Sequence, residues 1–216
     1  FEYKSPVNAT TGKRYVLTST STTSPITNVT AAVSVSGTYK TQYQISFDAT
    51  GLGADATGTL VTVAGNAKST VPFTDWFDAS SNLSYAYSDP VTSSTPGKQY
   101  RWNTTSGLGQ SAKSASFTVS GTGTVTAAYV TQYKITFAQS GIGGDSTGTV
   151  VTVGGVGKTA TDLPFTSDWI DSGSSLSYSY SDPVTSSVAG KRYTLIAPAP
   201  SPSSPISVTS SVTVTG

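Results

Sequence analysis

Apolar and polar residues alternate along short stretches of the chain, which is the pattern of strands that bury one face. The alternation is clear over 43–47, 85–87 and 117–119. Two continuous apolar pairs, Leu60-Val61 and Val150-Val151, predict strands that are buried more completely. No stretch has the spacing of an amphipathic helix, and glycine-rich turns separate the runs. The pattern therefore predicts an all-β fold.

A repeat of about 90 residues organises these strands. Residues 41–47 reappear as 131–137, and residues 57–63 reappear as 147–153, both at an offset of 131 − 41 = 90. Later motifs recur at 168 − 75 = 93, so a short insertion lies between: 75–78 and 168–171, 83–91 and 176–184, 97–100 and 190–193. Because the motifs keep their order, the chain contains two copies of one unit.

A period of this length, with short strands and frequent turns, is typical of a seven-stranded immunoglobulin-like sandwich of about 100 residues. We therefore predict tandem immunoglobulin-like β-sandwich modules over 39–127 and 128–216, preceded by a partial module or donor-strand tail over 1–38. Residues 39–47 are expected to form one long strand that runs from one module into the next. Pro90 and Pro183 have no N–H to donate, so we expect them at strand edges or turns.

The N-terminal segment, residues 1–38, matches the second half of a unit. Residues 1–7 match 85–91, and residues 33–37 match 212–216. Strands without partners expose apolar faces and backbone N–H and C=O groups. Burial of one large apolar side chain is worth about 1.5–3 kcal/mol, so we expect this segment to be covered.

Strand addition to another copy is one way to cover it, and a head-to-tail contact that does not close produces a filament. We therefore predict that the segment donates strands to a neighbouring subunit. The interface is expected to consist of its apolar residues: Phe1, Tyr3, Val7, Tyr15, Leu17, Ile26, Val29, Val33 and Val35. The alternatives are an intrachain cap on its own module and a chain that has been cut.

Composition excludes several classes of protein. Only 11% of the residues are charged, against about 25% in typical globular proteins, and the formal net charge is +1. Without clustered cations the chain is a poor candidate for nucleic-acid binding. No run approaches the roughly 18 apolar residues of a membrane span, and without cysteine there is no disulfide. The chain begins with Phe1 rather than Met, so we expect a mature chain whose leader has been removed.

Four sequons favour the secretory route. Asn8, Asn28, Asn82 and Asn103 each begin an Asn-x-Ser/Thr motif, the acceptor pattern for N-linked glycans. We therefore expect an extracellular, cell-surface glycoprotein.

The carboxylates do not form a catalytic pattern. Asp75 and Asp78 flank an aromatic pair, and Asp168 and Asp171 do the same in the second unit. Paired carboxylates serve glycoside hydrolysis, but a catalytic pair is seldom duplicated along a chain, so a structural role is expected. With no histidine, a Ser–His triad is impossible. We predict that the protein is not an enzyme and has no cofactor and no metal.

Two further patterns are interpreted structurally. Asp55 and Asp145 lie in glycine-rich turns, but one carboxylate per turn falls short of the 6–8 oxygen ligands of calcium. Lys13, Lys98 and Lys191 recur beside a tyrosine-bearing strand. We interpret them as solvated edge lysines that block unwanted strand pairing; an isopeptide crosslink to Asn or Asp is the alternative.

The repeat resembles those of archaeal extracellular surface proteins. The residues that carry the resemblance are Gly37-Thr38-Tyr39-Lys40-Thr41-Gln42-Tyr43, the Asp-Trp motif, the Ser-Tyr-Ser-Tyr-Ser-Asp-Pro-Val run and the Gly-Lys-Arg-Tyr run. Within that group the chain resembles subunits of the archaeal thread filament. The resemblance implies glycosylated, pilin-like subunits joined by an N-terminal donor strand inserted into the next subunit.

The sequence therefore predicts a structural subunit of an extracellular filament, with itself as partner and a role in adhesion or surface structure. A monomeric modular stalk, S-layer-associated or binding carbohydrate or the cell surface, is the alternative. An accessory domain of a secreted hydrolase is the third candidate.

Overall fold

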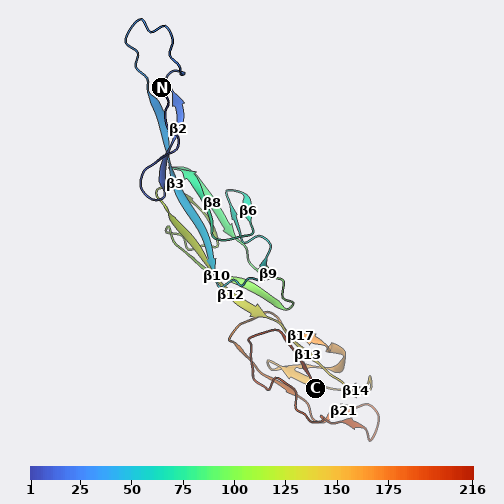
Figure 1. Ribbon diagram of the computed structural model, residues 1–216. Coiled ribbons are helices and arrows are strands. Elements are labelled where there is room, and N and C mark those ends of the chain that lie inside the picture. Colours follow the sequence, from blue (N-terminus) through green and yellow to red (C-terminus); the bar gives the residue numbers. More distant parts are fainter. The chain divides into compact units, whose positions relative to one another are not determined.

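A computed structural model describes residues 1–216, and it confirms the all-β prediction. Its only helical element is one turn of 3-10 helix, η1 (Ala160–Asp162). The chain forms two compact units (Figure 1). Unit 1 comprises Phe1–Gly51, Thr57–Val91 and Trp102–Tyr129; unit 2 comprises Leu52–Ala56, Thr92–Arg101 and Val130–Gly216. The division of the sequence into 1–38, 39–127 and 128–216 stays a prediction.

Unit 1 is built from strands in two sheets. Its strands are β1 (Val7–Asn8), β2 (Lys13–Thr20), β3 (Gly37–Thr50), β5 (Val61–Val63), β6 (Asn66–Lys68), β7 (Phe73–Asp78), β8 (Asn82–Tyr87) and β11 (Ser114–Thr118). Strands β4 (Ala56–Thr57), β9 (Val91–Ser93), β10 (Lys98–Ser106) and β12 (Gly123–Tyr133) have residues in both units.

Strand β3 is 14 residues long, which confirms a long strand over 39–47, and it lies wholly within unit 1. Its first half pairs with β2 in antiparallel fashion, and the two lie side by side in Figure 1. Its second half pairs with β7 antiparallel and with β12 parallel, so this sheet is mixed. Alternation places Ile45 and Phe47 inside, where both are fully buried.

The core of unit 1 lies between the mixed sheet and the β11-β8-β5-β6 sheet. Phe47 of β3 contacts Tyr85 of β8 with ring centroids 5.8 Å apart, and Tyr85 contacts Phe117 of β11 at 6.3 Å. Rings at these separations add packing energy beyond the area they bury. The predicted strands around Leu60-Val61 and Val150-Val151 are confirmed as buried, with exposures of 6% or less.

Unit 2 repeats this packing with shorter strands. Its strands are β13 (Ile135–Ala138), β14 (Ser146–Thr147), β15 (Val151–Val153), β16 (Val156–Lys158), β17 (Phe165–Thr166), β18 (Ile170–Asp171), β19 (Ser175–Leu176), β20 (Tyr178–Tyr180), β21 (Val184–Ser186), β22 (Arg192–Tyr193), β23 (Ile206–Ser207) and β24 (Val212–Thr215). Phe137 and Tyr178, the repeat counterparts of Phe47 and Tyr85, are also in ring contact, at 5.3 Å. The two prolines lie at turns directly before β9 and β21, as predicted.

The N-terminal segment has the same residue types as unit 2 but not the same burial. Val208 is 0% exposed, whereas its repeat counterpart Val29 is 60% exposed. In unit 2, Val208 packs in a cluster with β13 and β15 residues such as Phe137 and Val151. The segment lacks counterparts of those first-half strands, so its apolar residues are covered only in part.

This contrast predicts the stability of two matched variants. Val208→Ala is expected to lower the free energy of unfolding by about 2 kcal/mol, because it removes buried methyl groups and leaves a cavity. Val29→Ala is expected to change the free energy of unfolding of the monomer by less than about 0.5 kcal/mol. Urea denaturation of both proteins checks this, and equal losses would contradict the packing described for the two segments.

Candidate assembly interface

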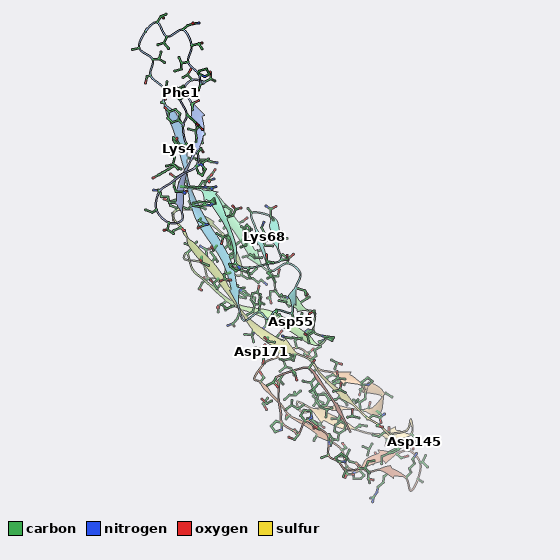
Figure 2. All side chains as sticks on the ribbon, viewed as in Figure 1. Phe1, Lys4, Asp55, Lys68, Asp145 and Asp171 are labelled. Carbon is green, nitrogen blue, oxygen red and sulfur yellow. The ribbon has the colours of Figure 1, made fainter.

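The nine predicted interface residues fall into two groups. Phe1, Tyr3, Val7, Tyr15 and Leu17 lie on or beside β1 and β2, and Figure 2 shows Phe1 beside the β2–β3 ribbon. The others lie in or next to the long connection between β2 and β3, which contains no strand: Ile26, Val29, Val33 and Val35. None of the nine is fully buried, and Phe1, Val7, Val29 and Val33 are 38–60% exposed.

Tyr3 contacts residues of both groups. Its ring meets Phe1 edge-on at 5.9 Å, and its hydroxyl donates to the carbonyl of Val35 at 2.9 Å. A methyl group on Gly37 would come within 3.0 Å of the Tyr3 ring and 3.1 Å of Leu17. A side chain at position 37 would therefore push these residues apart.

Sequence reasoning missed Tyr39, which completes this surface. Tyr39 lines a shallow apolar hollow with Tyr3, Val7 and Tyr15, and its hydroxyl donates to the carbonyl of Lys4 at 2.9 Å. The repeat contained the signal, because Tyr129 lies at an offset of 129 − 39 = 90. We name Tyr3, Val7, Tyr15 and Tyr39 the aromatic hollow.

The counterparts of Tyr3 are more completely enclosed. The Tyr87 hydroxyl lies within hydrogen-bond distance of the carbonyls of Asp48 and Val125. The Tyr180 hydroxyl similarly contacts Ala138 and Val214, and burial raises the pKa of Tyr180 to about 12. One carbonyl of each pair lies in a first-half strand or at its end. Tyr3 contacts only the other carbonyl, that of Val35.

A charged cluster fixes the glycine-rich turn that contains Asp55. Its carboxylate accepts hydrogen bonds from Ser93, from Lys98 at 3.0 Å and from Tyr100 at 2.6 Å. These donors stabilise the carboxylate, so the pKa of Asp55 falls well below its usual value, chiefly through Ser93 and Tyr100. The pKa of Lys98 is raised in turn by Tyr100 and Asp55.

The same cluster recurs at Asp145, labelled in Figure 2. Its carboxylate accepts from Ser186, Tyr193 and Lys191, and the lysine nitrogen lies 2.9 Å from Oδ2. Ser186 and Tyr193 are the largest causes of a pKa for Asp145 well below its ordinary value. The lysines therefore neutralise carboxylates rather than standing free at a strand edge, which corrects the interpretation of Lys98 and Lys191.

The N-terminal segment carries half of this cluster. Lys13 and Tyr15 match Lys98 and Tyr100, and the Lys13 nitrogen lies 5.2 Å from the Tyr15 ring centroid. A hydrogen bond with Tyr15 raises the pKa of Lys13. The segment contains no aspartate. The chemical complement of this half-cluster is a carboxylate.

The charge state of the two complete clusters argues against isopeptide bonds. Amide formation needs a neutral lysine amine and a carboxyl group that can lose water. Here the hydrogen bonds lower the carboxyl pKa and raise the lysine pKa, so both partners are held in their ionised forms.

Intact mass spectrometry of denatured, unglycosylated chain is therefore expected to give the summed mass of its residues. Loss of one or two water molecules would reveal crosslinks at these pairs and contradict the ion-pair description.

The duplicated carboxylates Asp78 and Asp171 have a structural role. The Asp78 carboxylate accepts from Lys40 at 2.8 Å and from the Gln42 amide at 2.7 Å. In unit 2, Asp171 accepts from Arg101 and from Gln132, the counterpart of Gln42. The cationic partners lower the pKa of both aspartates. A glycosidase general acid needs the opposite shift.

The four sequon asparagines, Asn8, Asn28, Asn82 and Asn103, all lie exposed. No helix is long and apolar enough to cross a membrane, and no group of three or more acidic residues is placed to hold a metal ion. Comparisons with protein-family models, curated proteins and solved structures found no match.

The carboxylate clusters predict how stability depends on pH. Because the folded-state pKa values of Asp55 and Asp145 lie below the ordinary 3.8, their contribution is complete above about pH 5. It is lost as the pH falls through the folded-state values. Asp55→Asn/Asp145→Asn is therefore expected to melt at a lower temperature at pH 7 and to lose less stability between pH 5 and pH 2.

Thermal melting across this pH range checks the prediction, with Glu2→Gln, which removes a single exposed carboxylate outside the clusters, as the control. A double variant whose melting temperature falls as steeply as that of the parent chain in acid would contradict it.

Proposed function

We propose that the chain is a structural subunit of an extracellular filament, built from tandem immunoglobulin-like sandwich modules. The subunits polymerise head to tail because residues 1–38 supply strands to a neighbouring copy. The observation that carries this proposal is the difference between Val29 and Val208, or Val7 and Val184, which have the same residue type and opposite burial.

The area available at this segment suits an assembly contact. Nine apolar side chains at about 1.5–3 kcal/mol each give a gain comparable with, or larger than, the roughly 4–15 kcal/mol that association costs in lost freedom. Part of that gain is already realised within the chain, because no residue of the set is wholly exposed. The low charge of the surface adds little electrostatic repulsion between copies.

One observation favours the second candidate, a monomeric surface stalk. Strand β2 is already paired on both sides, with β1 and with β3. The β3-facing backbone groups of β2, and those of Arg14 and Tyr15 on its other edge, therefore need no partner from another copy, and the segment can serve as an intrachain cap. The two candidates differ in whether the exposed valines are used in association.

Matched charge substitutions distinguish them. Val29→Asp places a carboxylate in the proposed interface, whereas Val156→Asp places one on β16 of unit 2; the two valines are 60% and 58% exposed. Val29→Asp is expected to abolish filaments seen by negative-stain electron microscopy, because burial of an unpaired charge is costly. Val156→Asp is expected to leave the filaments intact.

Deletion of residues 1–38, which removes the segment together with the first two residues of β3, is the companion test, and a folded monomer that does not polymerise is expected. Filaments of normal length from the deleted chain or from Val29→Asp would overturn the proposed role of the segment.

A further inference from the structure

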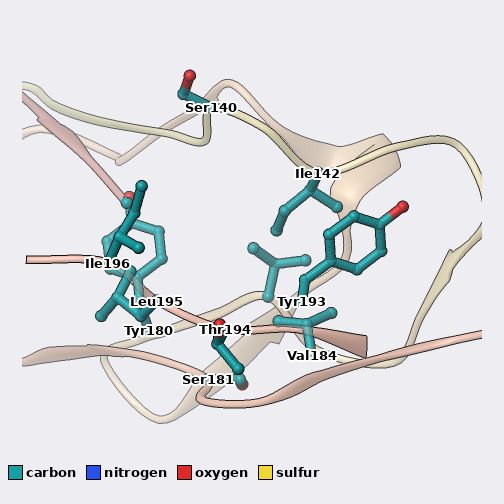
Figure 3. A pocket seen from close by; sticks show the side chains of 11 residues that line it. Ser140, Ile142, Tyr180, Ser181, Val184, Tyr193, Thr194, Leu195 and Ile196 are labelled. Carbon is teal, nitrogen blue, oxygen red and sulfur yellow. The ribbon is translucent and has the colours of Figure 1, made fainter. Parts of the chain in front are cut away.

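Unit 2 contains a pocket next to an unpaired strand edge. Ser140, Ile142, Val150, Tyr180, Val184 and Leu195 are among the residues that line it. Figure 3 shows Ile142 and Tyr193 on one side, with Tyr180, Leu195 and Ile196 on the other. Ile196 is 82% exposed, the most exposed large hydrophobic residue of the chain. Strand β22 pairs only with β21, so its other edge is free.

The walls of this pocket are the repeat counterparts of the aromatic hollow. Tyr180, Val184 and Tyr193 occupy the positions of Tyr3, Val7 and Tyr15. Leu195 occupies the position of Leu17, which lies beside the hollow. Strand pairing supports the match, because Val184 pairs with Tyr193 as Val7 pairs with Tyr15. The amide N–H of Leu195 donates to Asp182, and that of Leu17 donates to the matching Ser5.

In the two preceding repeats of the chain, a tyrosine from the following strand lies at the equivalent of this pocket. Tyr39 donates its hydroxyl to the carbonyl of Lys4 at 2.9 Å. Tyr129 donates to the carbonyl of Ser88 at 2.8 Å, and its side chain is only 6% exposed. The residue of unit 2 that matches the acceptors Lys4 and Ser88 is Ser181, and it lines the pocket. This pocket therefore has an apolar wall and a backbone carbonyl acceptor, which together suit the side chain of a tyrosine.

The strand that carries the tyrosine also pairs with the strand edge beside the hollow. Strand β2 runs for eight residues because β3 pairs along it, with Leu17 opposite Tyr39 and Val16 opposite Lys40. Its counterpart in unit 2 is a strand only over Arg192–Tyr193. An incoming strand paired with this edge would extend it through Leu195, as β3 does for β2.

We propose that this pocket and the free edge of β22 form the acceptor site for β3 of a second copy, with Tyr39 seated in the pocket. Thr194 then lies opposite Lys40, and Leu195 opposite Tyr39. The carbonyl of Gly190 accepts the Gln44 N–H, as the Gly12 carbonyl does within the chain at 2.8 Å. The inference rests on the proposed self-assembly and specifies its acceptor site; the 1–38 segment contributes Gly37 and Thr38, the first two residues of this donor strand.

A second copy of the chain is the favoured occupant, because Tyr39 of its β3 is less enclosed in its own chain than it would be in the unit 2 pocket. Around Tyr39 the hollow is formed by the N-terminal segment alone, which is largely exposed. The unit 2 pocket adds Ile142 and Val150, walls that the segment lacks. Moving β3 from its own β2 to β22 of a neighbour therefore buries Tyr39 more deeply and covers Ile196.

Disulfide trapping between two singly substituted chains tests the register. The chain has no cysteine, so Lys40→Cys and Thr194→Cys each carry one thiol. Opposed residues of antiparallel strands have Cα atoms about 4.5–5.5 Å apart, within the range that a disulfide spans. Both substitutions are mild, because Thr194 is exposed and the Lys40–Asp78 ion pair is about 40% exposed.

A mixture of the two variants is expected to form a disulfide-linked dimer under mild oxidation. Lys40→Cys mixed with Val156→Cys, a site on exposed β16, is the matched control and is expected to give little. Adding Tyr39→Ser to the Lys40→Cys chain is expected to reduce the yield about tenfold or more, since the buried ring is lost. Tyr39→Phe is expected to reduce it much less.

The outcomes separate this inference from the proposed function. Filaments without the Lys40–Thr194 crosslink, or equal yields with Val156→Cys, overturn the acceptor site and leave filament formation standing. Absence of both filaments and crosslink overturns the two together. A crosslink that is insensitive to Tyr39→Ser overturns the role of the tyrosine.

Discussion

A two-layered core is stable only when both layers are present, and this constraint accounts for most of what distinguishes the parts of the chain. Phe47 reaches Tyr85 across one core, and Phe137 reaches Tyr178 across the other. Each pair joins a strand from the first half of a repeat to one from the second half. The N-terminal segment has Phe1 and Tyr3 in the second-half positions, but they contact each other and no first-half ring. The same side chains are therefore buried or exposed according to whether the opposing strand is present.

Alternation and the repeat were sufficient to predict the all-β fold, the long strand β3 and the buried pairs at Leu60 and Val150. A repeat match alone does not fix the structure at 33–35, where Val33 and Val35 alternate as Val212 and Val214 do. Strand β24 forms because β13 pairs with it in parallel. Residues 33–35 have no such partner, so the same pattern produces no strand. A local pattern records the propensity for a strand, whereas the partner decides whether it forms.

The charged clusters were harder to predict because their members lie far apart in the sequence. Asp55 and Tyr100 are separated by 45 residues, and Asp145 and Tyr193 by 48. Only the fold brings each glycine-rich turn onto the following Lys-x-Tyr strand. The aspartate recurs in both repeats, followed by the same Ser-x4-Lys-x-Tyr spacing, and that recurrence was the available signal. With so few charges in the chain, these clusters place ionised groups where a turn must be fixed to a strand.

Tyrosine has a second role in this molecule, as a connector between one repeat and the strand that follows it. The hydroxyls of Tyr39 and Tyr129 each reach back to a carbonyl of the preceding second-half segment, at Lys4 and at Ser88. A phenol suits this position because its ring fills an apolar pocket while its O–H satisfies a backbone acceptor at the pocket wall. The contact needs only a strand edge and a hollow, and unit 2 has both at β22 and Ile142. A connection that works within one chain can therefore also work between chains, which would allow a tandem-repeat protein to extend itself without a specialised interface.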